Sequence, residues 1–451
     1  MRPPWLIREL PAPADPSARM LALHASAPAR YPAFLDSAAT GTPLARHSLL
    51  LGAPGQRLVL DAVGGLVGPG RGGRFCERLD QWWRATAHPV LPASGPFAGG
   101  WFLYLGYELA GEIEPTLRLP PSPLPVVAMA WRMQAALWLD HESGRVCALA
   151  EAGAGAELER LCEDWNACAP LPEPEDWSAP AVAEDDPELY LAACRRALGH
   201  IAAGDIYQAN LARRWRAALP EGVAAPALYA RLRKSNPGAF AGIAQLEDLA
   251  ILSSSPERLV RVRGREIDTR PIAGTRPRAG ADAEAIAAMT GSAKERAEHV
   301  MLIDLERNDL GRVCEAGSVH VDEFMAVESY AHVHHIVSNV AGRLREDATP
   351  GAVIRALFPG GTITGCPKVR CLQLIGELEG RGRGAYTGAM GYLAADGSLD
   401  LNILIRTMTV RGGRIEWQAG AGIVADSVPE RELEETRAKA RGMLRALGRP
   451  D

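Results

Sequence analysis

The stretch "ELYLAACRRALGHIAAGDIYQANLARRWRA", residues 188–217, predicts a helix followed by a strand. An Asp-Pro pair directly before it is typical of a helix start, and the helical spacing of its apolar residues ends at Gly204. Beyond that glycine the stretch is strand-like, and side chains alternate along a strand. Gln208 and Asn210 are therefore expected to point to one face.

The rest of the chain mixes strands and helices without a repeating strand-helix-strand rhythm. Short apolar runs such as "GWFLYLGYEL", residues 100–109, predict strands in the first part of the chain. In "LAILSSSPERLVRVRGREIDTR", residues 249–270, the pattern predicts two strands around a turn. The fold class expected from this mixture is α+β.

Length and composition divide the chain into three regions. A chain of 451 residues suggests two or three domain-sized units or one large composite domain. Prolines and acidic residues replace any hydrophobic period between the two longer parts. We expect a strand-rich region over residues 1–167, a linker over 168–185 and a second long region from residue 186.

The net charge, the lengths of the apolar runs and the cysteine pattern bear on the partners and the compartment of the protein. The net charge is -5, with both signs spread along the chain, which argues against a nucleic-acid surface. No apolar run approaches the roughly 18 residues of a membrane span, so no membrane is expected. The 8 cysteines form no CxxC pair, as is typical of a reducing compartment. We expect a soluble cytoplasmic protein.

One predicted helix carries an acidic pair in its first turns. In "SAKERAEHVMLIDLERNDLGRV", residues 292–313, Ser292 and Glu295 form a capping box. Glu295 and Glu298 are three apart and share a face of the helix. The plainer interpretation is a solvated acidic first turn, where carboxylates favour the helix dipole.

A second predicted helix offers further carboxylates for a metal site. "SVPERELEETRAKARGML", residues 427–444, opens with a capping box of Ser427 and Glu430. Glu432, Glu435 and Lys439 follow along one stripe. Together the two helices can supply a four-carboxylate cage for Mg²⁺, a hard cation that prefers oxygen ligands.

Three further motifs carry polar groups with two interpretations each. One of the three histidines in "YAHVHHIVS", His332, His334 or His335, is either an acid/base or a satisfied buried histidine. The glycine-rich turn at residues 361–365 offers backbone N–H groups to an anion, or is a plain loop before a helix. Arg406 and Lys439 are donors for carboxylates, or members of surface ion pairs.

Many motifs, in the same order along the chain, resemble those of the chorismate-utilising enzymes. The resemblance implies a chorismate-binding catalytic region over residues 186–446. The matching runs are "GDIYQ", "SPER", "RPIAGTRPR", "DLERNDLGRV", "HHIVS", "GGTITGCPKVR", "IRT" and "AGAGIVADSVPE" with "EET" and a lysine. So many motifs in one order are far more specific than a single short motif. The resemblance implies two packed β-sheets with helices outside, and an N-terminal region like that of anthranilate synthase component I.

The resemblance also implies a metal and a general acid. By motif position Glu298 and Glu435 look like direct ligands of a Mg²⁺ that holds the ring carboxylate of chorismate, with Glu295 and Glu432 acting through waters. Glu257, in "SPER", falls where the family's general acid assists departure of the C4 hydroxyl. A desolvated carboxyl can stay protonated for that task.

Other matching positions surround the substrate. His335 and Thr362 match positions near the ring and its leaving groups. The positions that resemble contacts to the two carboxylates, or the loop that covers the ring, are Tyr386, Arg406, Gly422, Lys439, Ala273, Gly274 and Thr275.

The nucleophile is indicated by Gln208. Members of the family that add water to chorismate carry a lysine base at this position, and an amide cannot deprotonate water. Gln208 therefore favours ammonia as the nucleophile. Since no GxCxG nucleophile run is present, ammonia is expected from a separate glutamine amidotransferase subunit.

Two ammonia-using branches remain. "QANLARRW", "AGSVHVDEFMAVE" and the compact chain resemble aminodeoxychorismate synthase component I, which makes 4-amino-4-deoxychorismate for 4-aminobenzoate and folate. Ala273 instead resembles anthranilate synthase component I, because well-known aminodeoxychorismate synthases carry lysine there. The first branch is favoured, and a non-catalytic chorismate-binding regulator is a third alternative.

A regulatory pocket is a further expectation for the N-terminal region. Related chains bind tryptophan near the stretch that matches "FLDSA", which holds Asp36 and Ser37 here. A structural turn is the plainer interpretation of this stretch.

Overall fold

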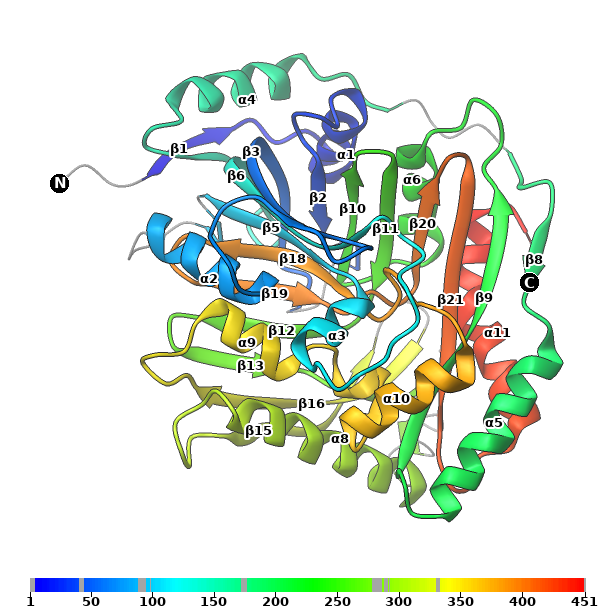
Figure 1. Cartoon of the computed structure of the whole chain (residues 1–451). Helices are drawn as coiled ribbons and strands as arrows, with labels where there is room; N and C mark the ends of the chain where they lie inside the picture. Colours follow the sequence, from blue (N-terminus) through cyan, green and yellow to red (C-terminus); the bar gives the residue numbers. More distant parts are fainter. Residues whose placement is uncertain are drawn as a thin grey trace.

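A computed structural model describes residues 5–39, 44–87, 95–97, 99–171, 177–277, 286–287, 291, 293–329 and 333–449. For residues 273–277, 293–295, 329 and 333 it describes the backbone alone. The α+β fold class is confirmed, because helices surround extensive antiparallel sheet (Figure 1).

Two long strands, β3 (His47–Asp61) and β6 (Val126–Asp140), join the two halves of the β-structure. They pair with each other along most of their length, and the register shifts between Pro54 and Arg57. On one side of that shift β6 pairs with β5 (Gly100–Leu105), and on the other side with β7 (Val146–Glu151). A bulge of this kind bends a strand, so one pair of strands serves both sheets.

The first sheet extends from β5 through successive antiparallel pairs. Its further strands are β18 (Ala389–Ala394), β19 (Leu399–Asn402), β12 (Arg258–Arg263), β13 (Glu266–Thr269), β16 (Val333–Arg343), β14 (Ile272–Pro277) and β15 (His320–Ser329). β16 pairs with β13 and β14, and also with β15. A short strand, β4 (Leu66–Val67), pairs with β3.

The second sheet extends from β3 in the other direction. Its strands are β2 (Ala33–Asp36), β10 (Phe240–Leu246), β11 (Leu249–Ser255), β20 (Thr407–Arg411), β21 (Arg414–Ile423), β9 (Gln208–Ala218), β8 (Val182–Glu184) and β17 (Gly365–Cys366). β1 (Trp5–Leu10) pairs with β7. In Figure 1, β10, β11, β20, β21 and β9 run up the right-hand half, while β12, β13, β16 and β15 cross the lower left.

The three regions expected from the sequence are interleaved in space. β2 pairs with β10, and β5 pairs with β18, so the N-terminal strands complete both sheets of the C-terminal part. Within the expected linker, β8 adds to β9. The boundaries at residues 167 and 185 stay a prediction, and no sheet belongs to the N-terminal region alone among the residues that the structure describes.

Helices lie on the outer faces of the sheets, and the apolar side chains form layers. The helices are α1 (Pro16–Ser26), α2 (Phe75–Thr86), α3 (Ala110–Ile113), α4 (Gly155–Ala167), α5 (Pro187–Ala202), α6 (Ala225–Ser235), α8 (Ala293–Gly311), α9 (Pro350–Leu357), α10 (Lys368–Glu379) and α11 (Pro429–Ala446). Two 3₁₀ turns, η1 (Tyr107–Leu109) and η2 (Gly361–Ile363), complete the elements. One buried cluster joins strands of both sheets, including Phe102, Met129, Ile251 and Met390. Two others pack the outer faces against helices.

The stretch at residues 188–217 folds as expected from its pattern. Asp186 caps α5, since its side chain accepts a hydrogen bond from the Glu188 backbone N–H at 3.0 Å. Gln208 and Asn210 are both buried on β9. The capping box expected at Ser427 is wrong: α11 begins at Pro429 after Val428, and the Ser427 hydroxyl accepts a hydrogen bond from the Val424 N–H instead. The Ser292 capping box lies outside the described residues.

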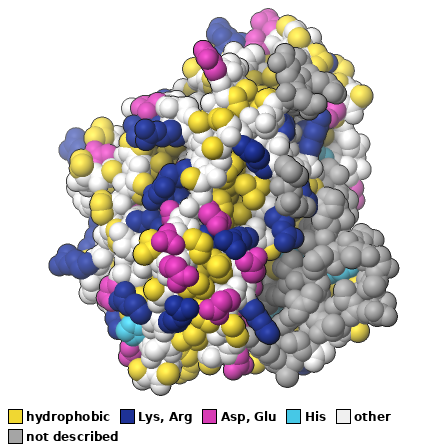
Figure 2. Space-filling view, turned by 90° about the vertical axis from the view of Figure 1, so that its right-hand side faces the viewer, with side chains coloured by type: hydrophobic (Ala, Val, Ile, Leu, Met, Phe, Trp, Pro, Cys, Tyr) yellow, Lys and Arg dark blue, Asp and Glu magenta, His cyan; other side chains and the backbone are white. Residues whose placement is uncertain are grey.

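The surface toward the right of Figure 1 mixes charges of both signs. Basic and acidic side chains interleave on this face (Figure 2). Between its elements, Arg437 of α11 pairs with Glu184 of β8 at 2.7 Å, and Arg195 of α5 pairs with Glu430 at 3.3 Å. Among the helices that the structure describes, none is long and apolar enough to cross a bilayer.

Candidate active site

A cavity of about 140 Å³ gathers six of the predicted site residues. Its wall is built by Asn210, Pro256, Glu257, Ile272, His335, Thr362, Ile363, Tyr386, Ile405, Arg406, Gln418, Ala419, Gly420 and Lys439. These residues come from strands of both sheets, from η2 and from α11. The structure therefore brings together six predicted side chains that are far apart in the sequence.

Glu257 is the buried carboxyl of the cavity. It follows the end of β11, and 6% of it is exposed. Thr362 Oγ1 donates a hydrogen bond to Glu257 Oε1 at 2.7 Å. Burial raises the pKa of Glu257 to about 7, although the Thr362 hydrogen bond, the Lys439 and Arg406 charges and the Ile272 backbone N–H oppose the rise. A carboxyl that is partly protonated near neutral pH can act as a general acid.

A second part of the cavity carries cationic and hydroxyl donors. Arg406 lies between β19 and β20 with φ 52°, a left-handed conformation that is costly for a non-glycine residue. Its carbonyl accepts a hydrogen bond from the Ser254 N–H at 3.1 Å, which holds that conformation. Burial raises the pKa of Tyr386 to about 12, so its hydroxyl remains a neutral donor.

Lys439 approaches the same cavity from α11. Its ammonium donates a hydrogen bond to the Gly420 carbonyl at 2.9 Å and pairs with Glu435, one helical turn earlier, at 2.7 Å. Cations and a hydroxyl at one end of a cavity suit the carboxylates of a small dicarboxylic substrate.

Gln208 and Gly422 lie next to the cavity rather than in its wall. A Cβ added at Gly422 would collide with the Gln208 amide nitrogen, and it would lie 3.7 Å from Glu298 Oε1. Glycine at this position therefore leaves the space that the Gln208 amide occupies. The Glu298 carboxylate of α8 faces the same glycine.

The predicted metal ligands are only partly placed by the structure. Glu298 comes from α8 and lies near Gly422, next to the cavity, whereas Glu435 of α11 pairs with Lys439 of the cavity wall. Glu432 lies close enough to Tyr190 and Cys194 of α5 for its charge to raise the pKa of both, and the Glu435 charge also raises the pKa of Tyr190. The Glu295 side chain lies outside the described residues.

Carboxylates from two helices suit Mg²⁺, which binds through one or two carboxylates and keeps waters or substrate oxygens as its other ligands. The described side chains contain no group of three His, Cys, Asp or Glu residues placed to hold a metal ion. A fully protein-made cage is therefore not formed by that part of the chain. Mg²⁺ stays a prediction.

The segment predicted to cover a ring is a strand. Along β14, Ala273 is opposite Ile336 and Thr275 is opposite His335 of β16, with a register shift around Gly274. The segment thus lies beside the histidine that borders the cavity. The side chains of residues 273–275 lie outside those that the structure describes.

Sequence reasoning missed a buried ionisable cluster behind Glu257. Glu306 and Asp309 of α8 are both buried, and the Lys368 ammonium forms an ion pair with Asp309. Burial and the neighbouring negative charges of Asp309 and Glu257 raise the pKa of Glu306. The spacing of Glu306 and Asp309 in "DLERND" was the only signal, because Lys368 is distant in sequence.

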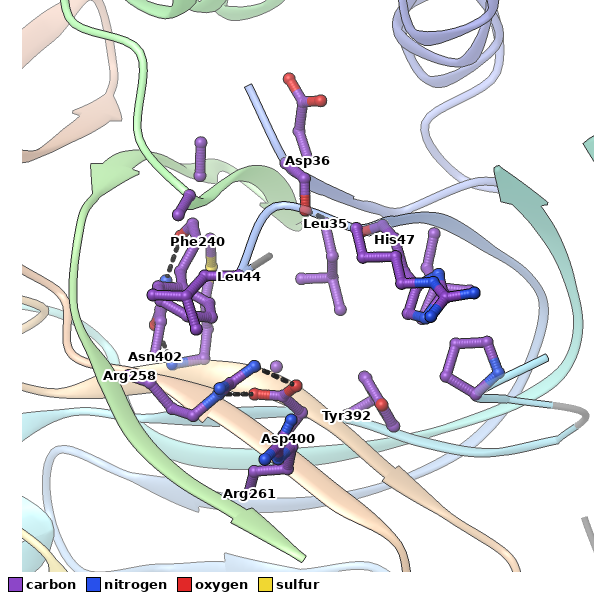
Figure 3. Close-up of a pocket in the computed structure, with 18 of the residues that line it drawn as sticks. Leu35, Asp36, Leu44, His47, Phe240, Arg258, Arg261, Tyr392, Asp400 and Asn402 are labelled. Atoms are coloured by element: carbon purple, nitrogen blue, oxygen red, sulfur yellow. Dashed lines mark hydrogen bonds and ion pairs between the residues drawn. The ribbon is translucent and has the colours of Figure 1, made fainter. Parts of the chain in front are cut away.

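A larger cavity of about 210 Å³ lies elsewhere between the sheets. Leu35, Asp36 and Ser37, from the stretch interpreted as a structural turn or a tryptophan site, border it (Figure 3). Asp36 Oδ2 accepts hydrogen bonds from Arg233 Nε at 2.9 Å and Tyr229 Oη at 3.1 Å. Tryptophan binding stays a prediction. Because the smaller cavity contains the carboxyl suited to acid catalysis, it is the candidate active site.

Comparisons with known proteins agree with this geometry. The family described as chorismate binding enzyme matches residues 74–445. Anthranilate synthase component 1 of Thermus thermophilus is 42% identical over 371 residues, which cover 80% of this chain and 79% of the relative. Aminodeoxychorismate synthase component 1 of Bacillus subtilis is 40% identical over 372 residues, 78% of this chain and 77% of the relative.

A solved structure extends the agreement to the fold. Anthranilate synthase component I from Streptococcus pneumoniae superimposes with a TM-score of 0.79 at 31% identity, covering 90% of this chain and 93% of that one. Similarity of this extent shows the family. The buried Glu257 and the cationic Arg406 and Lys439 of the cavity agree with it. The chain is a member of the chorismate binding enzymes, and it is a chorismate-utilising enzyme.

Proposed function

We propose that this chain is the chorismate-aminating component of aminodeoxychorismate synthase, which converts chorismate and ammonia to 4-amino-4-deoxychorismate for 4-aminobenzoate and folate synthesis. The main observation in support of amination is that the buried amide of Gln208 lies beside a cavity that contains a protonatable Glu257. An amide cannot act as the base that activates water, whereas ammonia needs no base. "QANLARRW" supports this branch.

Some residues of the cavity bind chorismate, and Glu257 transfers the proton. Tyr386, Arg406 and Lys439 bind the carboxylates of chorismate and fix the ring. Glu257 gives its proton to the C4 hydroxyl, the carbon–oxygen bond breaks, and water leaves. Ammonia forms the new carbon–nitrogen bond, and its surplus proton returns to the Glu257 carboxylate. The sum is chorismate plus ammonia giving 4-amino-4-deoxychorismate plus water.

Two components from outside the chain complete the proposal. Mg²⁺ would be held by Glu298 and Glu435 and would supply positive charge for the ring carboxylate. Glu295 and Glu432 would support it through waters. A separate glutamine amidotransferase subunit would deliver ammonia, because the sequence contains no GxCxG nucleophile run.

Anthranilate formation is the second candidate. Ala273 favours it, since this residue resembles the anthranilate branch, and relatives of both names are about equally similar. In that reaction His335 would assist the loss of pyruvate after amination. Without a lysine at 273, amination at C4 needs direct attack by ammonia or a nucleophile from elsewhere.

The test is incubation of the full chain with chorismate, MgCl₂ and ammonium chloride, followed by chromatography of the products. We expect 4-amino-4-deoxychorismate and no anthranilate. Anthranilate as the product would replace the proposal by the second candidate. Chorismate binding in calorimetry without any turnover would instead indicate a regulatory protein. Ala273→Lys then tests whether the chain can use a lysine nucleophile, through a faster C4 amination.

A further inference from the structure

Two buried side-chain amides lie on the same face of β9. Gln208 is 3% exposed and Asn210 is 8% exposed. Residues two apart in a strand are about 7 Å apart at the backbone, and glutamine reaches one methylene further than asparagine. Their amide groups can therefore converge on one small molecule beside the strand.

Within the described part of the chain, the oxygens of both amides have no hydrogen-bond donor. Gln208 Oε1 and Asn210 Oδ1 are buried, and neither accepts a hydrogen bond from any residue that the structure describes. A buried polar atom without a hydrogen-bond partner is uncommon, and a bound molecule can supply the partner. Because neither oxygen has a hydrogen bond to lose, rotation about the broad terminal torsion can turn it toward the cavity at little cost.

The backbone of Asn210 is fixed on both sides. Its N–H donates to the Thr364 carbonyl at 2.8 Å, and its carbonyl accepts from Arg383 Nη2 at 2.7 Å. Asn210 also borders the cavity that contains Glu257. A Cβ added at Gly420 would lie 2.7 Å from Asn210 Oδ1 and 2.8 Å from Tyr386 Oη, so the glycine makes room for both side chains.

Ammonia can donate hydrogen bonds to two acceptors such as the Gln208 and Asn210 oxygens. Ammonia has three N–H donors and one lone pair, and the lone pair must stay free to attack carbon. Oxygens that accept N–H hydrogen bonds hold the molecule without occupying the lone pair. A side-chain amide neither gives nor takes a proton at neutral pH, so it does not convert ammonia to ammonium and does not activate water.

We propose that Asn210 is a second ammonia-binding residue, which together with Gln208 orients ammonia toward the substrate in the cavity. This inference rests on the proposed amination of chorismate, but it is independent of which ring carbon is aminated. It assigns to Asn210 a role in selecting the nucleophile, whereas the binding of chorismate belongs to Tyr386, Arg406 and Lys439.

The experiment compares Asn210→Leu with the wild-type chain in steady-state assays at one pH. Leucine has nearly the shape of asparagine without its hydrogen-bonding atoms. We expect the KM for ammonium chloride to rise at least tenfold, while the KM for chorismate stays within twofold. Asn210→Ser keeps a shorter oxygen acceptor and should lie between the two. Leu211→Met, on the opposite face of β9, controls for disturbance of the strand.

The outcomes separate the two proposals. An unchanged KM for ammonium chloride in Asn210→Leu overturns the ammonia-binding role, and so does an equal rise in both KM values. If Asn210→Leu does not fold, Asn210→Ser decides by the same two constants. If the wild-type chain consumes no chorismate with ammonium chloride, the proposed function has failed and this inference fails with it.

Discussion

Thr362 donates a hydrogen bond from its hydroxyl to the Glu257 carboxyl at 2.7 Å, across 105 positions of sequence. The bond connects η2 with the end of β11 and orients the acid in the cavity. It also favours the charged carboxylate, and so it holds the pKa of Glu257 below the value that burial alone would give. The pair thus sets both the direction and the protonation of the proton donor.

Replacing the acid should abolish turnover without abolishing binding. Glu257→Gln keeps the shape but cannot give a proton, so we expect kcat to fall by about a hundredfold or more. Calorimetry should show chorismate binding within a fewfold of the wild-type chain. Glu247→Gln is the matched control, because the Glu247 side chain is 74% exposed. Retention of more than a tenth of the wild-type kcat in Glu257→Gln would remove Glu257 from the proton transfer.

The hydroxyl of Thr362 should control the pH profile. Glu257 is active when protonated, so kcat/KM for chorismate should fall as pH rises through about 7, at a constant concentration of unprotonated ammonia. Thr362→Val removes a hydrogen bond that favours the carboxylate, which raises the pKa of Glu257. The alkaline fall should move to higher pH, and Thr362→Ser should leave it in place. A shift to lower pH would contradict this assignment.

A methyl group at Gly422 should disturb the amide of Gln208. The added Cβ of Gly422→Ala would collide with that amide nitrogen. A displacement of about 1 Å at a reacting group can cost about a hundredfold in rate, so we expect a loss of kcat of that size. Gly199→Ala in α5 is the control, since its Cβ would meet no atom within 4 Å. Equal kcat values for the two variants would place Gln208 outside the reaction.

Local elements were predictable because neighbouring residues determine them. Asp186 and Gly204 mark the ends of one helix region in the sequence, and alternation puts Gln208 and Asn210 on one face of β9. At Ser427 the same reasoning failed, because its hydroxyl is occupied by the Val424 N–H and α11 begins two residues later. A capping motif predicts a helix start only where its side chain has no competing partner.

Non-local features were not predictable from pattern alone. The sharing of β3 and β6 between two sheets depends on a register shift that leaves no period in the sequence. The motif resemblance identified Glu257 and Thr362 separately, but their hydrogen bond depends on the packing of η2 against the strand end. Asn210 lies within the "QANLARRW" run, but its place in the cavity wall and its buried oxygen without a described donor depend on the fold.

The proposed metal site can be tested by binding as well as by activity. Titration of Mg²⁺ into the wild-type chain by calorimetry should show one site. Glu298→Gln and Glu435→Gln each remove a charged oxygen ligand, so we expect affinity to fall by about tenfold or more. Glu434→Gln is the control, because Glu434 has a 66% exposed side chain next to Glu435. Equal Mg²⁺ affinity in all four proteins would exclude this site.

Arg383 should be the strongest single determinant of stability near the site. Its guanidinium is fully buried and pairs with Glu379 at 2.6 Å. Removing one partner of a buried ion pair leaves an uncompensated charge, so Arg383→Met should lower the free energy of unfolding by about 3–5 kcal/mol, measured by urea denaturation. The double variant with Glu379→Leu should lose less than the single one, because it buries no lone charge.

A surface pair gives the comparison for that measurement. Arg307 and Asp304 form an ion pair at 3.0 Å with side chains 52% and 63% exposed. Arg307→Met should therefore change the free energy of unfolding by less than about 1 kcal/mol. Arg383 also donates hydrogen bonds to the Asn210 and Ile363 carbonyls, which lie on either side of the cavity. If Arg383→Met were no less stable than Arg307→Met, the buried pair would not be what holds β9 and η2 together.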